Sequence, residues 1–488
     1  MSTFLSCVRS LPQISHPQCF FALSHQITLI LFTDSENTES CGRFVCSLVI
    51  SQRHFRKISL KRLWSKGDNS IVKQKVGVGS SWKCGHIISA VVLRRSRNPN
   101  TPDIHSFFQI YKTMLLSRVR GSLVAAVVAD CIGAKFEFSR FVNIDKVLNA
   151  VKKLEQNRTT MKKKVAEGKK EKQGDVLSFT DDTAMARSIA ASLIEHKDVN
   201  VRDIGARFAK EFEKEPSRGY GGSVITVLRA LADQDLEDVF QPAREQFDGS
   251  GSYGNGGGMR IAPLGLFCHQ LPLQELKEKT VSVTKLTHTH PYAIVGTLLE
   301  SYAVHLALSL DNSKPLDTDN FLGQLLERLR PTEKEIYDQR RQMKSKEKNS
   351  GDESEEEGIE GLPYCNKVEL IRDFLKRDVD SKEVRKKLGT KVTALDSIPT
   401  AVYCFLRGAS QSIPGTEERG PVEQTIIYAI SLGGDTDTVA TMAAAISGAF
   451  YGLESVPQAW QESCEGVRDA LLFGEKLTEI ISAREVKS

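Results

Sequence analysis

The sequence predicts an all-α fold, with one compact domain of many helices from about residue 114 to the end. In this region apolar residues recur at spacings of three and four, which is the pattern of helices with one buried face. Alternating apolar and polar runs, which indicate strands, are nearly absent there. Several expected helices are dense in Ala and Gly, as in 124–129 and 440–449, so their backbones can pack closely.

The expected helices begin and end at local signals. The first ends near Gly133, because glycine favours the turn that follows a helix. Two others begin at acidic and hydroxyl side chains, near Asp181 and Asp435, which suit the free N–H groups of a helix start. In chain order, helices are expected at 114–131, 182–195, 201–214, 222–231, 259–267, 273–286, 291–310, 321–329, 368–376, 399–406, 422–431, 438–451 and 466–482.

Residues 1–113 differ in composition from the rest. They hold fifteen Lys and Arg but only five Asp and Glu. The whole chain has 66 basic and 61 acidic residues, so residues 114–488 hold 51 basic and 56 acidic residues. The basic character therefore belongs to this N-terminal extension, and no direct nucleic-acid binding is expected of the body. An Arg- and Ser-rich, acid-poor composition suits either a transit peptide or a start site placed too far upstream, so we expect a disordered extension that folding and activity do not need.

Other features of the composition narrow the class of protein. The ten cysteines form no CxxC pair, no zinc pattern and no disulfide framework, which fits a reducing compartment. No apolar run reaches the roughly 18 residues that a membrane helix needs. The charged segments 152–172 and 333–361 cannot bury a core, so solvated loops are expected within the 114–488 domain. A monomer is the default expectation.

The most informative feature is a pair of acidic clusters about 250 residues apart, each at the start of a helix rich in small residues. Residues 180–183 read Thr-Asp-Asp-Thr, and residues 433–438 read Gly-Gly-Asp-Thr-Asp-Thr. If the fold brings both starts together, four carboxylates share a pocket and need a cation. Oxygen ligands suit a hard ion such as Mg²⁺ or Mn²⁺, so the clusters suggest a central two-metal site.

The simpler interpretation is that these residues only cap helices, since Asp and Thr are ordinary N-caps. Each helix needs one cap, whereas each cluster supplies two carboxylates, and the surplus charge needs a partner. Residue chemistry alone leaves both interpretations open. Glu137 has a similar ambiguity, because a Glu just beyond a helix end is usually an exposed loop residue but could be an acid/base carboxylate beside the pocket.

Two glycine-rich segments, 218–222 and 249–258, precede helices. Glycine lets the backbone approach a ligand, and a helix start offers free N–H groups to an anion, although each segment could also be a flexible connector. Phe247 and Tyr253 lie beside and within the second segment as stacking faces for a base. His288 could contact a phosphate or hydroxyl, and His290 is taken as structural because no third zinc ligand is evident. These features suggest a phosphorylated nucleoside ligand, without choosing between phosphate-ester and glycosidic cleavage.

Six motifs stand out when the chain is taken as a whole. They are Thr-Asp-Asp-Thr-Ala-Met-Ala-Arg at 180–187, Arg-Gly-Tyr-Gly at 218–221, Gly-Ser-Tyr-Gly-Asn-Gly at 251–256, Met-Arg at 259–260, Ile-Pro-Thr-Ala-Val-Tyr-Cys-Phe-Leu-Arg at 398–407 and Ser-Leu-Gly-Gly-Asp-Thr-Asp-Thr at 431–438. Together these motifs resemble the ADP-ribosylglycohydrolase family, in the family's order and over about 114–482. The combination looks like the serine- and poly(ADP-ribose)-directed branch of the family rather than the arginine-directed one.

The resemblance implies a helical bundle around two Mg²⁺ ions per subunit, with Glu137 as the catalytic carboxylate on a mobile flap. The glycine-rich loops would hold the diphosphate and ribose, and the aromatic pair would face the adenine or the distal ribose. The implied metal ligands are Thr180, Asp181, Asp182, Asp435, Asp437 and Thr438. The implied substrate-binding residues are Gly221, Phe247, Ser252, Tyr253, Gly254, Asn255 and His288.

The implied activity is Mg²⁺-dependent release of ADP-ribose from serine in proteins, from poly(ADP-ribose) and from O-acetyl-ADP-ribose, with ADP-ribosylated proteins and the polymer as partners. Whether Glu137 or a metal-site Asp is the base stays open. The alternatives are an arginine-directed hydrolase and a non-catalytic ADP-ribose binder, which the intact clusters disfavour. The expected setting is DNA repair in the nucleus and cytoplasm, with the mitochondrial matrix as the alternative. Lys135 departs from the uncharged residue that the resemblance leads us to expect there.

Overall fold

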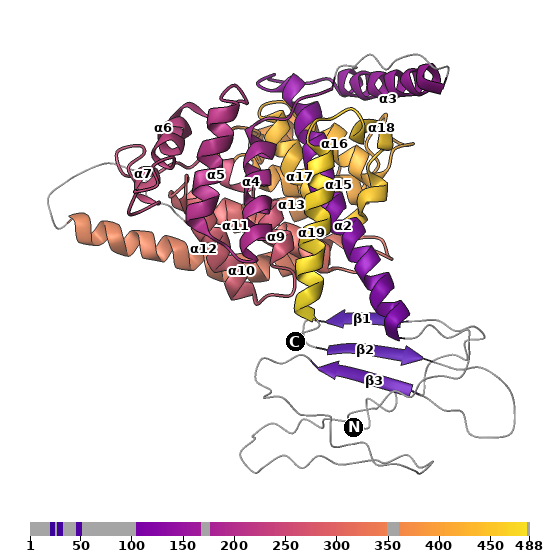
Figure 1. The fold of residues 1–488 in the computed structure, drawn as a ribbon, viewed down its shortest axis with the longest axis horizontal. Coiled ribbons are helices and arrows are strands. Elements are labelled where there is room, and N and C mark those ends of the chain that lie inside the picture. The colour runs from indigo at the N-terminus through magenta and orange to yellow at the C-terminus, as the bar shows by residue number, and fades with distance from the viewer. Residues whose placement is uncertain are drawn as a thin grey trace, which may run out of the picture. The chain divides into compact units, whose positions relative to one another are not determined.

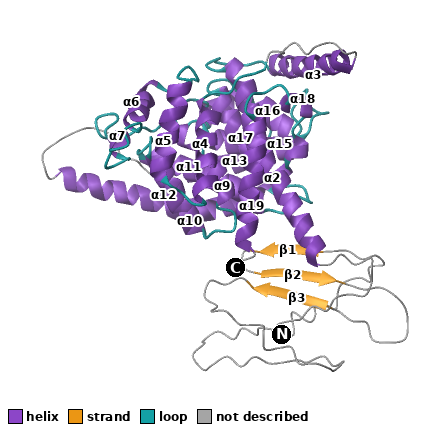
Figure 2. Ribbon diagram, in the orientation of Figure 1, coloured by secondary structure: helices purple, strands orange, loops and turns teal. Residues whose placement is uncertain are grey.

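The computed structural model describes residues 20–24, 27–32, 45–50, 104–166, 176–348 and 361–485, and these fall into two compact units that divide after Phe107. The first unit contains β1 (Phe20–Ser24), β2 (Ile27–Phe32) and β3 (Val45–Ile50), which form an antiparallel sheet in that order (Figure 2). A disordered extension is expected from its composition, whereas these three segments form strands. Its three strand segments are dominated by β-branched and other apolar residues, which favour strands.

The second unit is helical, which confirms the all-α fold class (Figure 2). Among the described residues, none of its helices is both long and apolar enough to cross a membrane. Its elements are α2 (Ile104–Gly133), η2 (Ala134–Phe136), α3 (Ile144–Ala166), α4 (Asp181–His196), α5 (Val201–Lys214), α6 (Gly222–Ala230), α7 (Gln241–Arg244), α8 (Gly256–Met259), α9 (Ala262–Phe267), α10 (Leu273–Lys285), α11 (Pro291–Ser309), α12 (Thr318–Lys348), α13 (Pro363–Phe374), α14 (Ser381–Lys387), α15 (Ile398–Ser410), α16 (Pro421–Ser431), α17 (Thr436–Tyr451), η3 (Leu453–Ser455), α18 (Gln458–Gln461) and α19 (Val467–Glu485).

Helix α17 lies at the centre of this unit and packs against α11, α15 and α16 (Figure 1). Its small residues also allow α2 to run antiparallel along it at close range. A Cβ atom on Gly448 would lie 2.2 Å from the carbonyl oxygen of Gly121, and one on Gly133 would lie 2.6 Å from the Cα atom of Asp437. Glycine at these contacts therefore sets the end of α2 directly against the start of α17, which carries the second acidic cluster.

The charged segments 152–172 and 333–361 are helical over 152–166 and 333–348, so the prediction of loops is wrong for those parts. Residues 152–166 belong to α3, and residues 333–348 belong to α12. Lys and Glu favour helices, and a helix with many exposed charged residues needs only a narrow buried face. Residues 167–175 and 349–360 lie outside the described part of the chain.

Several helix boundaries differ from the predicted ones. Helix α2 begins at Ile104, ten residues before Met114. The helix expected over 259–267 is divided into α8 and α9. The short helices α7, α14 and α18 were not expected, because a periodic pattern is hard to recognise in seven residues or fewer.

Candidate active site

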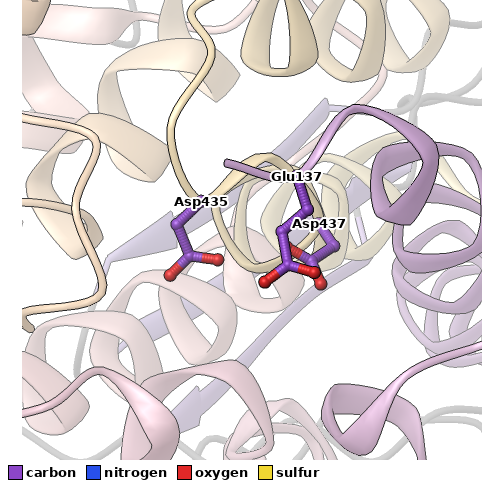
Figure 3. Close-up of side chains that lie close together, drawn as sticks. All are labelled: Glu137, Asp435 and Asp437. Atoms are coloured by element: carbon purple, nitrogen blue, oxygen red, sulfur yellow. The ribbon is translucent and has the colours of Figure 1, made fainter. Parts of the chain in front are cut away.

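The starts of α4 and α17, which carry the two acidic clusters, meet inside the helical unit. Thr438 Oγ1 donates a hydrogen bond of 3.3 Å to Oδ1 of Asp182. Glu137, Asp435 and Asp437 gather at the same place, and each offers a carboxylate oxygen within 4.8 Å of the other two (Figure 3). The fold thus unites both clusters with the loop carboxylate that follows η2.

Glu137 is held there by the pairing of its loop with the loop before α17. The N–H of Phe138 donates to the carbonyl of Gly434, and the N–H of Gly434 donates to the carbonyl of Ser139, both at 2.8 Å. Gly434 has a φ of 79°, and a Cβ atom there would lie 2.0 Å from the carbonyl oxygen of Thr390. Glycine is therefore required at 434, and the Gly-Gly of the second cluster serves loop packing as well as helix initiation.

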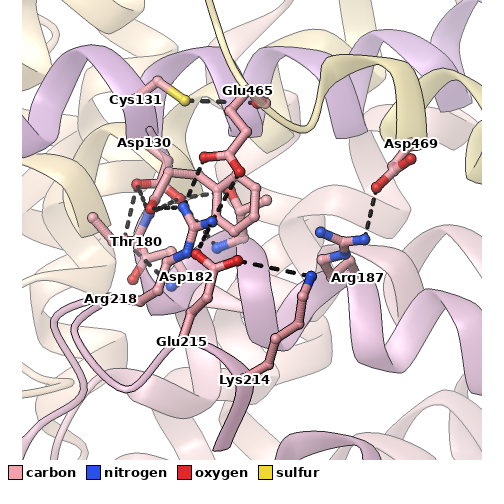
Figure 4. Close-up of polar contacts among 12 residues, drawn as sticks. Asp130, Cys131, Thr180, Asp182, Arg187, Lys214, Glu215, Arg218, Glu465 and Asp469 are labelled. Carbon is pink, nitrogen blue, oxygen red and sulfur yellow. Dashed lines mark hydrogen bonds and ion pairs between the residues drawn. The ribbon is translucent and has the colours of Figure 1, made fainter. Parts of the chain in front are cut away.

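Asp130, near the end of α2, holds the first cluster in place. Its carboxylate accepts hydrogen bonds from the N–H and hydroxyl of Thr180, at 3.0 and 2.8 Å, and from those of Thr183, at 3.1 and 2.6 Å (Figure 4). Asp130 therefore caps α4 from another helix. No role was predicted for Asp130 from the sequence. Its position inside an apolar, Ala-rich helix was the available signal, since a buried carboxylate needs donors.

Arg218 attaches the loop before α6 to the same cluster. Its guanidinium makes two hydrogen bonds of 2.8 Å to Glu465, contacts Glu215, and lies 3.8 Å from the ring centroid of Phe179 (Figure 4). The carbonyl of Arg218 accepts a hydrogen bond of 2.8 Å from the N–H of Asp181. The side-chain contacts of Arg218 therefore fix the backbone next to one of the predicted metal ligands.

Several carboxylates of the pocket are held in a form that resists ionisation. Burial, reinforced by Asp435, raises the pKa of Glu137 to about 6 and that of Asp437 to about 10. Burial, reinforced by Asp130, raises the pKa of Asp181 to about 8. Burial and the neighbouring Asp437 hold the pKa of Asp182 well above its usual range. Ionising all of these groups together therefore requires a compensating positive charge.

The pocket also leaves two acceptors without donors. Oδ2 of Asp182 and Oδ1 of Asp437 are buried and have no hydrogen-bond partner among the described residues. Buried carboxylate oxygens without partners are costly unless a cation satisfies them. The surrounding donors are carboxylates and Thr hydroxyls, the oxygen set that hard divalent cations prefer. The residues therefore fit a metal such as Mg²⁺.

The glycine-rich loop reaches the carboxylates through Asn255. Its Nδ2 atom donates a hydrogen bond of 2.6 Å to Oδ2 of Asp435. The same loop packs closely on His288, since a Cβ atom on Gly254 would lie 3.2 Å from His288 Nε2 and one on Gly256 would lie 2.7 Å from Cε1. The glycines here make room for a buried histidine, so this part of the loop is a packed element and not a flexible connector.

A buried chain of hydrogen bonds links Arg260 to His288 through Thr287. Arg260, which can only donate, gives a hydrogen bond of 2.6 Å to Thr287 Oγ1, and this oxygen lies 2.7 Å from His288 Nδ1. Because Arg260 donates to Thr287 Oγ1, we infer that the hydroxyl proton points at Nδ1, and the imidazole proton then lies on Nε2, close to Gly254. Burial and Arg260 lower the pKa of His288 to about 3, so the ring stays neutral. His288 therefore offers a neutral N–H donor to the loop side of the pocket.

The remaining predicted residues occupy different positions. Phe247 and Tyr253 are about half exposed and form a tilted pair with ring centroids 6.3 Å apart. Ser252 is buried and accepts a hydrogen bond of 3.3 Å from the N–H of Gly254. Gly221 is exposed at the start of α6, and the glycine against the first cluster is Gly219, where a Cβ atom would lie 3.5 Å from Oδ1 of Asp181.

Comparison with known proteins supports this arrangement. Residues 112–486 match the family model described as ADP-ribosylglycohydrolase. This chain belongs to the ADP-ribosylglycohydrolase family. It is 39% identical over 370 residues to ADP-ribosylhydrolase ARH3 of Xenopus tropicalis, which covers 76% of this chain and 97% of that protein. It is 38% identical over 366 residues to ADP-ribosylhydrolase ARH3 of Homo sapiens, with 75% and 94% covered.

Membership of the ADP-ribosylglycohydrolase family confirms the family named from the motifs and the glycosidase-type hydrolase class. The matched region agrees with the helical unit, which begins at Phe108. The family is metal-dependent in general, and this member has the carboxylate cluster that such chemistry uses.

Proposed function

We propose that this chain is an Mg²⁺-dependent hydrolase that releases ADP-ribose from serine in proteins and from poly(ADP-ribose), with O-acetyl-ADP-ribose as a further substrate. The relatives that it matches over most of their length carry the name ADP-ribosylhydrolase. One observation carries the proposal. Glu137, Asp435 and Asp437 converge within 4.8 Å, in the pocket where a buried oxygen of Asp182 has no partner among the described residues.

The residues proposed to hold two Mg²⁺ ions come from both helix starts. When bound, the ions supply positive charge that orients the ribose 2′- and 3′-hydroxyls and a water molecule. Asp130 keeps the first cluster in register by its hydrogen bonds to Thr180 and Thr183. Asn255 holds the second acidic cluster in position by its hydrogen bond to Asp435. The proposed ligands are Thr180, Asp181, Asp182, Asp435, Asp437 and Thr438.

Glu137 is the group proposed to move protons. Burial, followed by the charge of Asp435, raises its pKa to about 6, close to the range in which a carboxyl can both give and take a proton near neutral pH. Its carboxyl can therefore protonate the departing serine oxygen and accept a proton from the attacking water. Nearby carboxylates stabilise the positive charge that develops at the anomeric carbon.

The rest of the pocket is proposed to bind the ADP part of the substrate. The neutral Nε2–H of His288 can donate to a phosphate or ribose oxygen, beside the buried Ser252. The exposed rings of Phe247 and Tyr253 offer faces for the adenine. In this proposal the base lies on the glycine-rich loop and the reacting bond lies next to Glu137.

A panel of substrates tests the proposal. The full-length chain is incubated with matched peptides that carry ADP-ribose on serine or on arginine, and free ADP-ribose is measured by mass spectrometry. We expect release from the serine peptide, and loss of that release in Asp437→Ala. Release from the arginine peptide alone would replace the proposal with the arginine-directed activity. No release from either peptide by a folded, Mg²⁺-supplied protein would contradict hydrolase activity altogether.

A further inference from the structure

A surface of basic and aromatic side chains borders Glu137. It comes from two stretches of the chain, one that follows α2 and one that runs from the end of α14 into the next loop. Phe138 and Phe141 expose 74% and 57% of their surface, which is unusual for large apolar residues next to a buried pocket. The surface, called the basic rim below, consists of Lys135, Phe138, Arg140, Phe141, Arg385 and Lys391.

Backbone contacts hold the two stretches on either side of the loop before α17. The N–H of Phe138 donates to the carbonyl of Gly434 at 2.8 Å, and the N–H of Asp435 donates to the carbonyl of Thr390 at 2.9 Å. The guanidinium carbon of Arg385 lies 4.9 Å from the ring centroid of Phe141 and links the stretches directly. The two stretches of the basic rim thus contact each other, and the first begins beside the carboxyl that is proposed to act on the leaving group.

The basic rim is positive although the domain around it is acidic. The basic rim holds four Lys and Arg and no acidic residue, whereas residues 114–488 as a whole hold 51 basic and 56 acidic residues. Lys135 and Arg140 are exposed and have no acidic partner among the described residues, and Lys391 lies 3.7 Å from Asp396. The charge on the rim is therefore available to an anionic ligand.

Phe138 adds evidence of a different kind. Its φ of 59° lies in the left-handed region, which bulky residues rarely adopt. With three quarters of the residue exposed, little packing offsets this strain. Strained residues of this sort gather at ligand sites, and an exposed ring gains most when a flat group stacks on it.

We propose that the basic rim binds the portion of a poly(ADP-ribose) chain that stays behind after cleavage, beginning with the unit whose ribose oxygen departs beside Glu137. This inference rests on the function proposed above. Each polymer unit carries two phosphate charges and one adenine, which match the free cations Lys135 and Arg140 and the exposed ring of Phe138. Anionic grooves for nucleotide chains combine the same two elements, basic side chains and stacking rings. An acidic peptide would use the charges and leave the rings without a partner, so the polymer fits better.

The test compares one long and one short substrate on the same enzyme. Lys135→Glu/Arg140→Glu reverses two charges, and Phe138→Asn removes the ring while keeping a residue that tolerates a positive φ. Initial rates are measured with full-length protein on poly(ADP-ribose) of defined length and on a mono-ADP-ribosylated serine peptide. For poly(ADP-ribose) we expect each variant to raise KM about tenfold, the size of one lost stack or of two phosphate contacts. For the peptide, kcat/KM should stay within about twofold of the unmodified chain.

The control is Arg468→Glu, an exposed arginine on α19, which packs against α4 and α9 and not against the rim. This variant should leave KM and kcat/KM unchanged for both substrates. Rising salt should raise the KM for poly(ADP-ribose) less in the charge-reversal variant than in the control. Equal losses on polymer and peptide would overturn the proposal, because they would show that the residues act through Glu137. An unchanged polymer KM would overturn it as well. Failure of the proposed function would be distinguishable, since the unmodified chain would then release no ADP-ribose from either substrate.

Discussion

Thr438 donates a hydrogen bond of 3.3 Å to Asp182, and this contact joins two acidic clusters that are 256 residues apart in the sequence. The second oxygen of Asp182 and one oxygen of Asp437 are buried beside it with no hydrogen-bond partner among the described residues. The fold has therefore assembled a strongly acidic site in which two carboxylate oxygens receive no hydrogen bond from the described residues. The predictions below depend on that surplus of negative charge.

Replacing Asp437 by Asn should separate metal binding from folding. The amide has the same shape but no charge, so we expect the loss of ADP-ribose release and of the Mg²⁺-induced rise in Tm, with the metal-free Tm unchanged or higher. Differential scanning fluorimetry with EDTA and with Mg²⁺ measures both effects. The control is Asp145→Asn, an exposed carboxylate on α3. A variant that keeps its full Mg²⁺ response would show that Asp437 is not a ligand.

Glu137→Gln should behave differently from Asp437→Asn. Loss of a group that moves protons lowers kcat by about 10²- to 10⁴-fold, while the ligands of the metal remain. We therefore expect a large fall in kcat with the Mg²⁺-induced rise in Tm preserved. The measurement pairs steady-state kinetics with the same fluorimetry. Joint loss of the rate and of the metal response would instead place Glu137 among the ligands.

Stability without metal should decrease as the pH rises. The pKa values of about 8 for Asp181 and about 10 for Asp437 exceed the usual Asp value, so the folded state keeps protons that the unfolded chain has lost. Between pH 6.5 and pH 8 the free energy of unfolding should fall, by up to about 1.4 kcal/mol per pH unit for each such proton. Below about pH 7.5 the two histidines with lowered pKa values, His269 and His288, partly offset this fall, because their imidazoles still bind protons in the unfolded chain.

Urea unfolding in EDTA at pH 6.5 and pH 8 measures this slope. Mg²⁺ should stabilise the protein more at pH 8, because its ligands must be deprotonated to bind. Asp437→Asn should flatten the metal-free slope. A metal-free stability that is constant or increases across this window would mean that the buried carboxylates are already ionised.

Thr287→Val should weaken substrate binding through His288. The variant removes the oxygen that accepts from Arg260 and the hydroxyl that faces His288 Nδ1, so the Nε2–H donor is no longer fixed. We expect KM to rise more than kcat falls, with a loss of about 1–3 kcal/mol in stability from the unpaired buried guanidinium. Thr287→Ser keeps the hydroxyl and is the matched control. If Val and Ser give the same KM, the hydroxyl does not govern His288, and ¹⁵N NMR of the ring reports the tautomer directly.

Arg218→Lys should loosen the first acidic cluster. A lysine cannot reproduce the two hydrogen bonds to Glu465, so the backbone contact between Arg218 and Asp181 loses its support. We expect the Mg²⁺ concentration for half-maximal activity to rise about 10- to 100-fold, with recovery at high Mg²⁺. Arg187→Lys, which alters a single ion pair of 2.7 Å to Asp469, is the control (Figure 4). Activity that high Mg²⁺ cannot restore would point to a role in catalysis itself.

The sequence predicted helices well where the apolar spacing or the start signal of the helix was clear. The predicted bounds of α5, 201–214, agree with the structure, and those of α4 and α17 differ by at most two residues at either end. The same pattern failed at 152–172, where the Lys-rich stretch suggested a solvated loop and part of it is the exposed helix α3. Periodicity reports buried faces, so a helix with few buried residues leaves a weak signal.

The proposed metal and catalytic residues could be predicted from the sequence, but the residues that hold them in position could not. The two clusters and Glu137 were recognisable because their carboxylates exceed what helix caps need. No role was predicted for three residues that support the site: Asp130, Thr287 and Glu465. Asp130 and Glu465 act through hydrogen bonds to residues that are distant in the sequence. Thr287 acts through a hydrogen bond to His288 whose direction depends on Arg260. Such contacts exist only in the folded chain, and no spacing in the sequence encodes them.

The most direct test of the central claim is the release of free ADP-ribose from a serine-ADP-ribosylated peptide by the full-length chain, in EDTA and after addition of Mg²⁺. We predict no release in EDTA and sustained release with Mg²⁺, abolished in Asp437→Asn. Equal release in both conditions would contradict a metal site built from the two acidic clusters.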